Sequence, residues 1–195
     1  MTLGTLLRVA RTLDIQVTVN ARSRGADLDR LVNAHHAGLH ESVVAWFGRM
    51  LPEWILDPEV SFAIGAERGV IDLLAWHPGR RALLIIELKT DVVEISDLMA
   101  KAHQRRRLAR RIVAERGWDP VTVSVWIVVA DGSANRARVS RHLAVLRTAF
   151  PVDGRSMRSW LRSPDRAVAA LSFWPRPDLA ARHRVRVRVP GRVAA

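Results

Sequence analysis

The chain has 195 residues, of which 49% are hydrophobic, no cysteine, and a formal net charge of +12. This length predicts one domain with extensions, and the lack of cysteine excludes disulfides and thiolate metal sites. No apolar run reaches the roughly 18 residues of a membrane span and no signal peptide is evident, so we expect no membrane association and a cytoplasmic protein. The positive charge favours a polyanionic partner.

Residues 2–14 carry apolar side chains at helical spacing, which predicts a short amphipathic helix, and residues 15–19 alternate as an edge strand does. The first segment resembles the last helix of a lambda-repressor (XRE-like) helix-turn-helix domain. Residues 31–174 resemble the segment that follows such a domain in actinobacterial proteins. The resemblance implies that residues 1–14 are the remnant of a helix-turn-helix domain, and a plain packing helix is the alternative. Whether a full helix-turn-helix lies upstream of Met1 stays open.

Residues 28–50 form the next predicted helix, because apolar residues recur along one face. Glu41 lies on a different face, where it is either a candidate metal ligand or part of a solvated surface. His36 and His40 are four positions apart, as in a zinc pair. The lack of cysteine and of an HExxH motif favours a polar helix surface for these histidines instead.

The next stretch predicts three strands. Residues 60–64 form the first, and Glu59 at its start is the alternative to Glu41 as a metal ligand. Two runs rich in Val, Ile and Leu follow at residues 70–76 and 82–88, separated by His-Pro-Gly-Arg, a turn signal. Short runs of this kind, bounded by a turn, predict two buried strands in a hairpin.

Asp72, Glu87 and Lys89 interrupt the apolar surface of this hairpin. Glu87 and Lys89 are two positions apart, so they point to the same face of their strand. A turn centred on residues 78–81 places Asp72 directly opposite Glu87, with β-carbons roughly 5 Å apart. The sequence therefore predicts two carboxylates and a lysine on one side of an otherwise apolar sheet.

Two carboxylates this close repel each other unless a cation lies between them. Oxygen ligands favour Mg²⁺ or Mn²⁺, and a lysine beside the metal is placed to orient or deprotonate a water. The alternative is a salt bridge from Lys89 to Glu87 or Asp72. Lysine is rare in this chain, because only Lys89 and Lys101 are lysines among 31 basic residues. A lysine at the one position where this chemistry needs one therefore favours a chemical role for Lys89. A guanidinium would not serve easily, because it stays protonated and is bulkier.

Residues 95–116 predict a long helix ended by Gly117. The apolar run at residues 121–130 predicts a central strand that is buried on both faces and parallel to its neighbour, with the long helix as the crossover. Three further elements complete the ordered domain: a helix at 135–150, a short helical turn at 156–161 and an edge strand at 167–174.

An aspartate, a hairpin and then Glu-x-Lys resemble the PD-(D/E)xK nuclease superfamily, here as Ile71-Asp72 and Glu87-Leu88-Lys89. Isoleucine stands where the motif's proline would be. The order helix, three strands, helix, strand also matches the superfamily's αβββαβ core. We therefore expect an α/β fold over residues 15–175, with a restriction-endonuclease-like mixed central sheet flanked by helices.

The resemblance implies a role for each motif residue. Two strand carboxylates and one helix carboxylate hold Mg²⁺ or Mn²⁺, the lysine assists the attacking water, and a helix glutamine supports them. In this chain these positions are Asp72, Glu87, Glu41 (or Glu59), Lys89 and Gln104. The implied function is cleavage of DNA phosphodiesters. The alternative is a non-catalytic DNA-binding transcriptional regulator of helix-turn-helix type that keeps a degenerate nuclease fold as its scaffold.

The basic charge is concentrated in two stretches. Residues 101–111 carry six basic residues and no acid, and residues 176–195 carry six arginines and one aspartate, which together make 11 of the 12 net charges. We expect the tail to be disordered and to engage phosphates, or to pair as a strand only in a complex. The helix residues expected to bind DNA, unless the run is only a solvated face, are Lys101, Arg105, Arg106, Arg110 and Arg111. A homodimer stays open.

Overall fold

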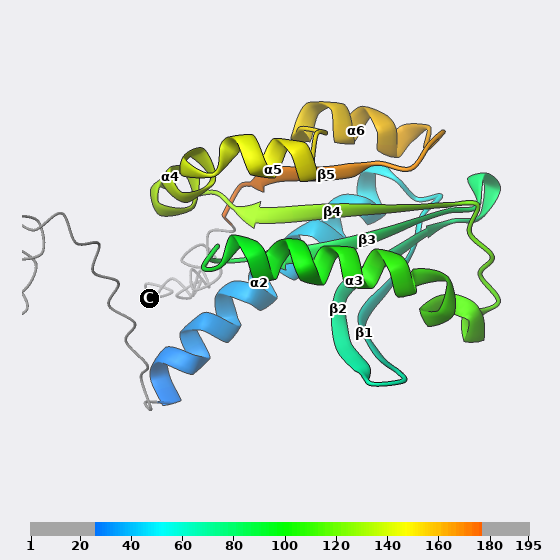
Figure 1. The fold of residues 1–195 in the computed structure, drawn as a ribbon, viewed down its shortest axis with the longest axis horizontal. Helices are drawn as coiled ribbons and strands as arrows, with labels where there is room; N and C mark the ends of the chain where they lie inside the picture. The colour runs from blue at the N-terminus through cyan, green and yellow to red at the C-terminus, as the bar shows by residue number, and fades with distance from the viewer. Residues whose placement is uncertain (1–25, 177–195) are drawn as a thin grey trace, which may run out of the picture. The chain divides into compact units, whose positions relative to one another are not determined.

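The computed structural model describes residues 26–176, with side chains from residue 33 onward. The chain divides into two compact units, residues 1–31 and 32–195. The helix predicted at 2–14, the strand predicted at 15–19 and the tail beyond residue 176 lie outside the described residues. The described part of the second unit is a mixed sheet of five strands flanked by helices, as the sequence predicts (Figure 1).

The strands follow one another across the sheet in chain order, β1-β2-β3-β4-β5. Neighbours pair antiparallel from β1 to β3 and parallel from β3 to β5. The strands are β1 (Ile55–Ile64), β2 (Glu67–His77), β3 (Ala82–Lys89), β4 (Thr122–Ala130) and β5 (Ala169–Trp174). The predicted hairpin, the parallel central strand and the edge position of the last strand are therefore confirmed.

The helices lie on both faces of this sheet, because each buries an apolar stripe against alternate residues of the strands. One core lies under α3 (Ile95–Val113), α4 (Ser133–Arg141) and α5 (Leu143–Ala149). The other lies under α2 (Ala26–Met50) and α6 (Gly154–Arg162). Two 3₁₀ turns, η1 (Pro78–Arg80) and η2 (Ala114–Arg116), complete the described elements. None of the described helices is long and apolar enough to cross a membrane.

Apart from shifts of a few residues at the ends of other elements, three elements differ from the prediction. β1 begins at Ile55 rather than at residue 60. The single helix predicted at 135–150 is two helices, because His142 has φ −114° and ψ 21°, outside the helical range. The short turn predicted at 156–161 is a helix that begins at Gly154, where the Asp153 side chain accepts the N–H of Ser156 and caps it.

Candidate active site

The candidate site begins at Asp72, where the alternation of β2 changes phase. Ile71 and Leu74 both lie in the core under α3, whereas Leu73 lies in the core under α2. Strict alternation would put Ile71 and Leu73 on the same face. Across the ladder, Glu59 has φ 51° and takes no part in the pairing. The irregular backbone at this point turns Asp72 away from both cores.

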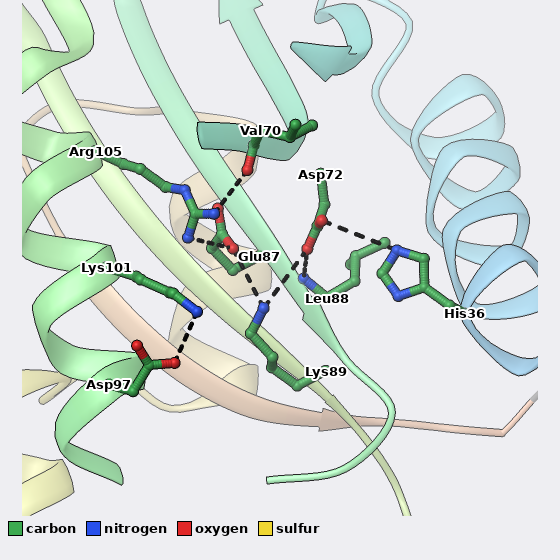
Figure 2. Close-up of polar contacts among 9 residues, drawn as sticks. All are labelled: His36, Val70, Asp72, Glu87, Leu88, Lys89, Asp97, Lys101 and Arg105. Atoms are coloured by element: carbon green, nitrogen blue, oxygen red, sulfur yellow. Dashed lines mark hydrogen bonds and ion pairs between the residues drawn. The ribbon is translucent and has the colours of Figure 1, made fainter. Parts of the chain in front are cut away.

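Asp72 also marks the place where β2 and β3 part. The last backbone pair of the hairpin is Leu73 with Ile86, in the register that sets Asp72 opposite Glu87. Beyond this pair, the N–H of Leu88 donates to Oδ2 of the Asp72 side chain at 2.7 Å instead of to the backbone of β2 (Figure 2). This hydrogen bond fixes the carboxylate beside the end of β3.

Lys89 extends from that end of β3 between the two predicted carboxylates. Its Nζ lies 3.4 Å from Oε2 of Glu87 and 3.9 Å from Oδ2 of Asp72 (Figure 2). The Lys89 side chain is 29% exposed and Asp72 is 18% exposed, whereas Glu87 is almost fully buried. The structure therefore gathers the three charged residues of the motif, with the lysine on the solvent side.

Glu87 is further held by Arg105 of α3. Nη1 of Arg105 lies 2.8 Å from Oε2 of Glu87 without the alignment of a hydrogen bond, and Nη2 donates to the carbonyl of Val70 at 2.6 Å. The second oxygen of Glu87, Oε1, is buried and has no hydrogen-bond partner. Burial, and then the charge of Asp72, raise the pKa of Glu87 from 4.5 to about 7, against the opposing effects of Arg105 and Lys89.

Arg105 thus has a different setting from the exposed phosphate contact predicted for it, because it is only 8% exposed. The signal for this was in the sequence. Residues three and four positions apart share one face of a helix. Arg105 therefore lies on the same buried face of α3 as Leu98, Ala102 and Ala109. A basic residue on the buried stripe of a helix requires a buried acid as its partner, and Glu87 meets that requirement.

The other basic residues predicted to bind DNA have varied surroundings. Lys101 pairs with Asp97 at 2.8 Å, and Arg110 donates to the carbonyls of Pro120 and Val121. Arg106 and Arg111 are exposed and make no hydrogen bond or ion pair within residues 26–176. Of the predicted set, these two are the arginines left most accessible to a phosphate.

Gln104, predicted to support the site, is bound elsewhere. Its side-chain amide donates to Oε1 of Glu67 at 3.2 Å, and the same oxygen accepts from Arg107 at 2.5 Å. These two hydrogen bonds, that from Arg107 first, lower the pKa of Glu67. In this structure Gln104 serves the start of β2 rather than the carboxylates of Asp72 and Glu87.

The two candidates for the third metal ligand, Glu41 and Glu59, line one cavity of about 340 Å³. His36 and His40 also line it, and Nε2 of His36 lies 3.9 Å from Oδ1 of Asp72 (Figure 2). The helix positions of His36 and Glu41 therefore border the Asp72 side of the site. The sequence showed these histidines only as neighbours on a helix, with no indication that Asp72 is the group they approach.

The carboxylates of Asp72 and Glu87 match the hard oxygen ligands that Mg²⁺ and Mn²⁺ take. The unpartnered Oε1 of Glu87 is a buried acceptor that a cation would satisfy. Among the residues that the structure describes, no group of three or more His, Cys, Asp or Glu could hold a metal ion. Mg²⁺ does not need such a group, because it commonly binds through one or two carboxylates and completes its shell with waters and substrate phosphates.

No family model, curated protein or solved structure matches this chain.

Proposed function

We propose that this chain is a metal-dependent, nuclease-like protein that cleaves DNA phosphodiesters. One observation carries the proposal: the Lys89 ammonium lies 3.4 Å from Glu87 and 3.9 Å from Asp72, at the point where β2 and β3 part. A lysine beside two carboxylates at an open strand end suits the activation of water on a phosphate. The order of helices and strands supports the same reading.

Asp72 and Glu87 are the residues that would hold Mg²⁺ or Mn²⁺, with waters and substrate phosphates completing its shell. When bound, the metal supplies positive charge that stabilises the developing charge on the phosphate. The partly exposed Lys89 ammonium positions an attacking water by donating a hydrogen bond to it. Arg105 holds Glu87 from the α3 side, so that this carboxylate keeps one orientation.

A non-catalytic DNA-binding scaffold is the second candidate, and the charge balance of the site favours it. Asp72 and Glu87 already face two cations, Lys89 and Arg105, so the four charges sum to zero when all are ionised. A network of this kind has its charges balanced without a metal. Under this reading the chain binds DNA as part of a regulator and does not cut it.

Calorimetry with Mn²⁺ and thermal melts on the same proteins separate the two candidates. The nuclease proposal expects Asp72→Asn and Glu87→Gln to weaken metal binding, since each removes an oxygen ligand. It expects Lys89→Ala to keep metal binding while cleavage falls by roughly a hundredfold or more. Asp97→Asn, on the exposed end of α3, is the control and leaves both unchanged.

The scaffold candidate predicts a different pattern from the same proteins. The wild type would bind no divalent metal even with DNA present. Each single change at Asp72, Glu87 or Lys89 would lower the melting temperature, because it leaves a partner charge unpaired in a partly buried site. Absence of metal binding in the wild type overturns the nuclease proposal.

A further inference from the structure

An arginine-lined groove lies at the free edge of the sheet, apart from the residues of the candidate site. It has a volume of about 540 Å³ and is bordered by β5 and α6, with one residue from α5. α5 and α6 cover opposite faces of the sheet, and both lie beside its edge strand β5 (Figure 1). The basic residues that line the groove are Arg147, Arg155, Arg158 and Arg162.

The groove follows from the way α6 packs. Met157, Trp160 and Leu161 are buried against the sheet. Arg155, Arg158 and Arg162 are three and four positions apart, so they share one face of the helix, and all are exposed. Arg147 reaches the groove from α5, where its Nη1 donates to the carbonyl of Phe150 at 3.5 Å. Four arginines from two helices therefore line one hollow.

One carboxylate, Asp153, faces these four positive charges. It caps α6 and interacts electrostatically with Arg147, which helps to lower its pKa. The side chains of Arg155, Arg158 and Arg162 make no hydrogen bond or ion pair with any described residue, although Arg158 lies over the ring of Trp174. Asp165, three positions after Arg162, pairs with Arg166 instead. Four like charges with a single counter-charge are unfavourable in the free protein, and an anionic ligand relieves the repulsion.

We propose that this groove binds the phosphodiester backbone of duplex DNA. Arg155 and Arg162 are seven positions apart on α6, which is about 10 Å at about 1.5 Å per residue. One strand of B-form DNA carries about three phosphates over that length, at about 3.4 Å each along the axis. The hydroxyls of Ser159 and Ser172 also line the groove, and serine hydroxyls are common phosphate donors. The choice of DNA as the polyanion rests on the proposed function, whereas the anion site itself does not.

Fluorescence anisotropy with a labelled DNA duplex tests this, in EDTA so that no cleavage interferes. The groove variant is Arg155→Gln/Arg158→Gln/Arg162→Gln. The control, Arg49→Gln/Arg68→Gln/Arg141→Gln, removes the same charge from exposed arginines that do not line the groove. We expect the groove variant to lose about tenfold or more in affinity and its slope of log K against log salt to fall by about 2 to 3. The control should lose much less.

A conservative variant keeps the test independent of folding. Arg155→Lys/Arg158→Lys/Arg162→Lys retains the charge and should retain most of the affinity and the salt slope. Equal losses in the groove and control variants would overturn the proposal, since only net charge would then matter. Tripolyphosphate binding that the groove variant abolishes, with DNA affinity unchanged, would also overturn it in favour of a small anion.

The same assay separates this inference from the cleavage proposal. In EDTA no metal is bound, so groove-dependent binding of the duplex is measured whether or not the protein is a nuclease. If the groove variant binds the duplex with wild-type affinity and still cleaves it, the groove proposal is overturned and the nuclease proposal is not. If binding of the duplex depends on the groove but the wild type binds no metal, only the nuclease proposal is overturned.

Discussion

Glu87 carries the largest electrostatic cost of any residue in the candidate site. Its side chain is 1% exposed. Its Oε1 is buried and has no hydrogen-bond partner to replace the hydrogen bonds that it would make to water. Arg105 and Lys89 compensate only in part, since burial and Asp72 still raise the pKa of Glu87 to about 7. A buried carboxyl whose pKa is raised toward neutral is a candidate for binding a cation or a proton, and the nuclease proposal uses it as a metal ligand.

Stability should therefore depend on pH through Glu87. Its pKa is raised from 4.5 to about 7, so the folded protein holds this proton more tightly than the unfolded chain does. The stabilising contribution is fully present below about pH 4.5, is lost as pH rises through 7, and is constant above that. The change is on the order of 3 kcal/mol.

Urea titrations of the wild type and Glu87→Gln at several pH values measure this contribution. The difference in unfolding free energy, wild type minus variant, should fall between pH 5 and pH 7 and level off above about pH 7.5. A difference that stays flat, or rises with pH, would show that Glu87 is not the buried, proton-binding carboxyl described above.

The pair of Arg105 and Glu87 should show strong coupling. Arg105→Met leaves the Glu87 carboxylate buried without its nearest cation, and we expect a loss of about 3 to 5 kcal/mol at pH 8. The loss should be smaller at pH 5, because Glu87 then takes up a proton. Combined with Glu87→Gln, the two changes should cost less than their sum by about 1 to 3 kcal/mol.

The exposed pair of Lys101 and Asp97 on the same helix is the matched control. Both side chains are about half exposed, so their coupling in the same double-mutant cycle should be about 0.5 kcal/mol or less. Comparable coupling in the two pairs would mean that Arg105 and Glu87 are not a desolvated pair.

Single residues of the site were predictable where geometry depends on local rules. The register of the hairpin, which brings Asp72 and Glu87 near each other, followed from the turn. The position of Lys89 beside Glu87 followed from strand alternation. The partner of Glu87 did not follow, because Arg105 was read as part of a basic run rather than as part of a buried stripe. The contact of Gln104 with Glu67 joins α3 to the start of β2, and no local rule predicts such a contact.

α6 is held against β5 at Gly154, where the helix and strand approach closely. A β-carbon at Gly154 would lie 2.9 Å from Cβ of Ser172, which is fixed by the strand backbone. Ser172 is also constrained because its Oγ accepts the N–H of the Trp126 indole at 2.9 Å. The position of the arginine-lined groove depends on this contact.

Gly154→Ala should therefore destabilise the protein by about 1 to 3 kcal/mol, because overpacking pushes α6 away from β5. Gly48→Ala in α2 is the control, since a β-carbon there meets nothing within 4 Å. The control should instead stabilise by up to about 1 kcal/mol, because alanine is the better helix former. Thermal melts of the two variants should move in opposite directions, and a shift of equal sign would contradict the close approach.

Elements with a strong pattern were predicted well. The hairpin followed from two apolar runs around Pro78–Arg80, and the parallel β4 followed from a continuous apolar run after a long helix. The early start of β1 was missed, because Pro58 and the left-handed Glu59 interrupt its pattern while its ladder to β2 continues on both sides. The division at His142 was missed because α4 and α5 bury residues on the same core, so apolar periodicity alone does not separate them.

Across the whole molecule, the distribution of positive charge along the sequence differs from its distribution in the folded structure. The sequence assigns 11 of the 12 net charges to residues 101–111 and 176–195. In the structure several of the α3 charges are internally paired. Residues 154–162 hold three arginines and no acid, although the chain outside the two basic stretches is nearly neutral in total. A local count therefore shows three of the groove charges, and only folding brings Arg147 to the same hollow.

The groove and the basic tail should therefore contribute separately to DNA binding. Deleting residues 176–195 removes six arginines and one aspartate. We expect the slope of log K against log salt to fall by about 2 or more if the tail engages phosphates. The arginines changed in the groove variant lie on α6 and not in the tail, so the two sets of phosphate contacts should be independent. Combining the deletion with the groove variant should therefore lower the slope by the sum of the two changes. Anisotropy titrations from low to moderate salt on the four proteins measure these slopes. An unchanged slope after the deletion would remove the tail as a phosphate contact, and a combined change well below the sum would mean that tail and groove compete for the same phosphates.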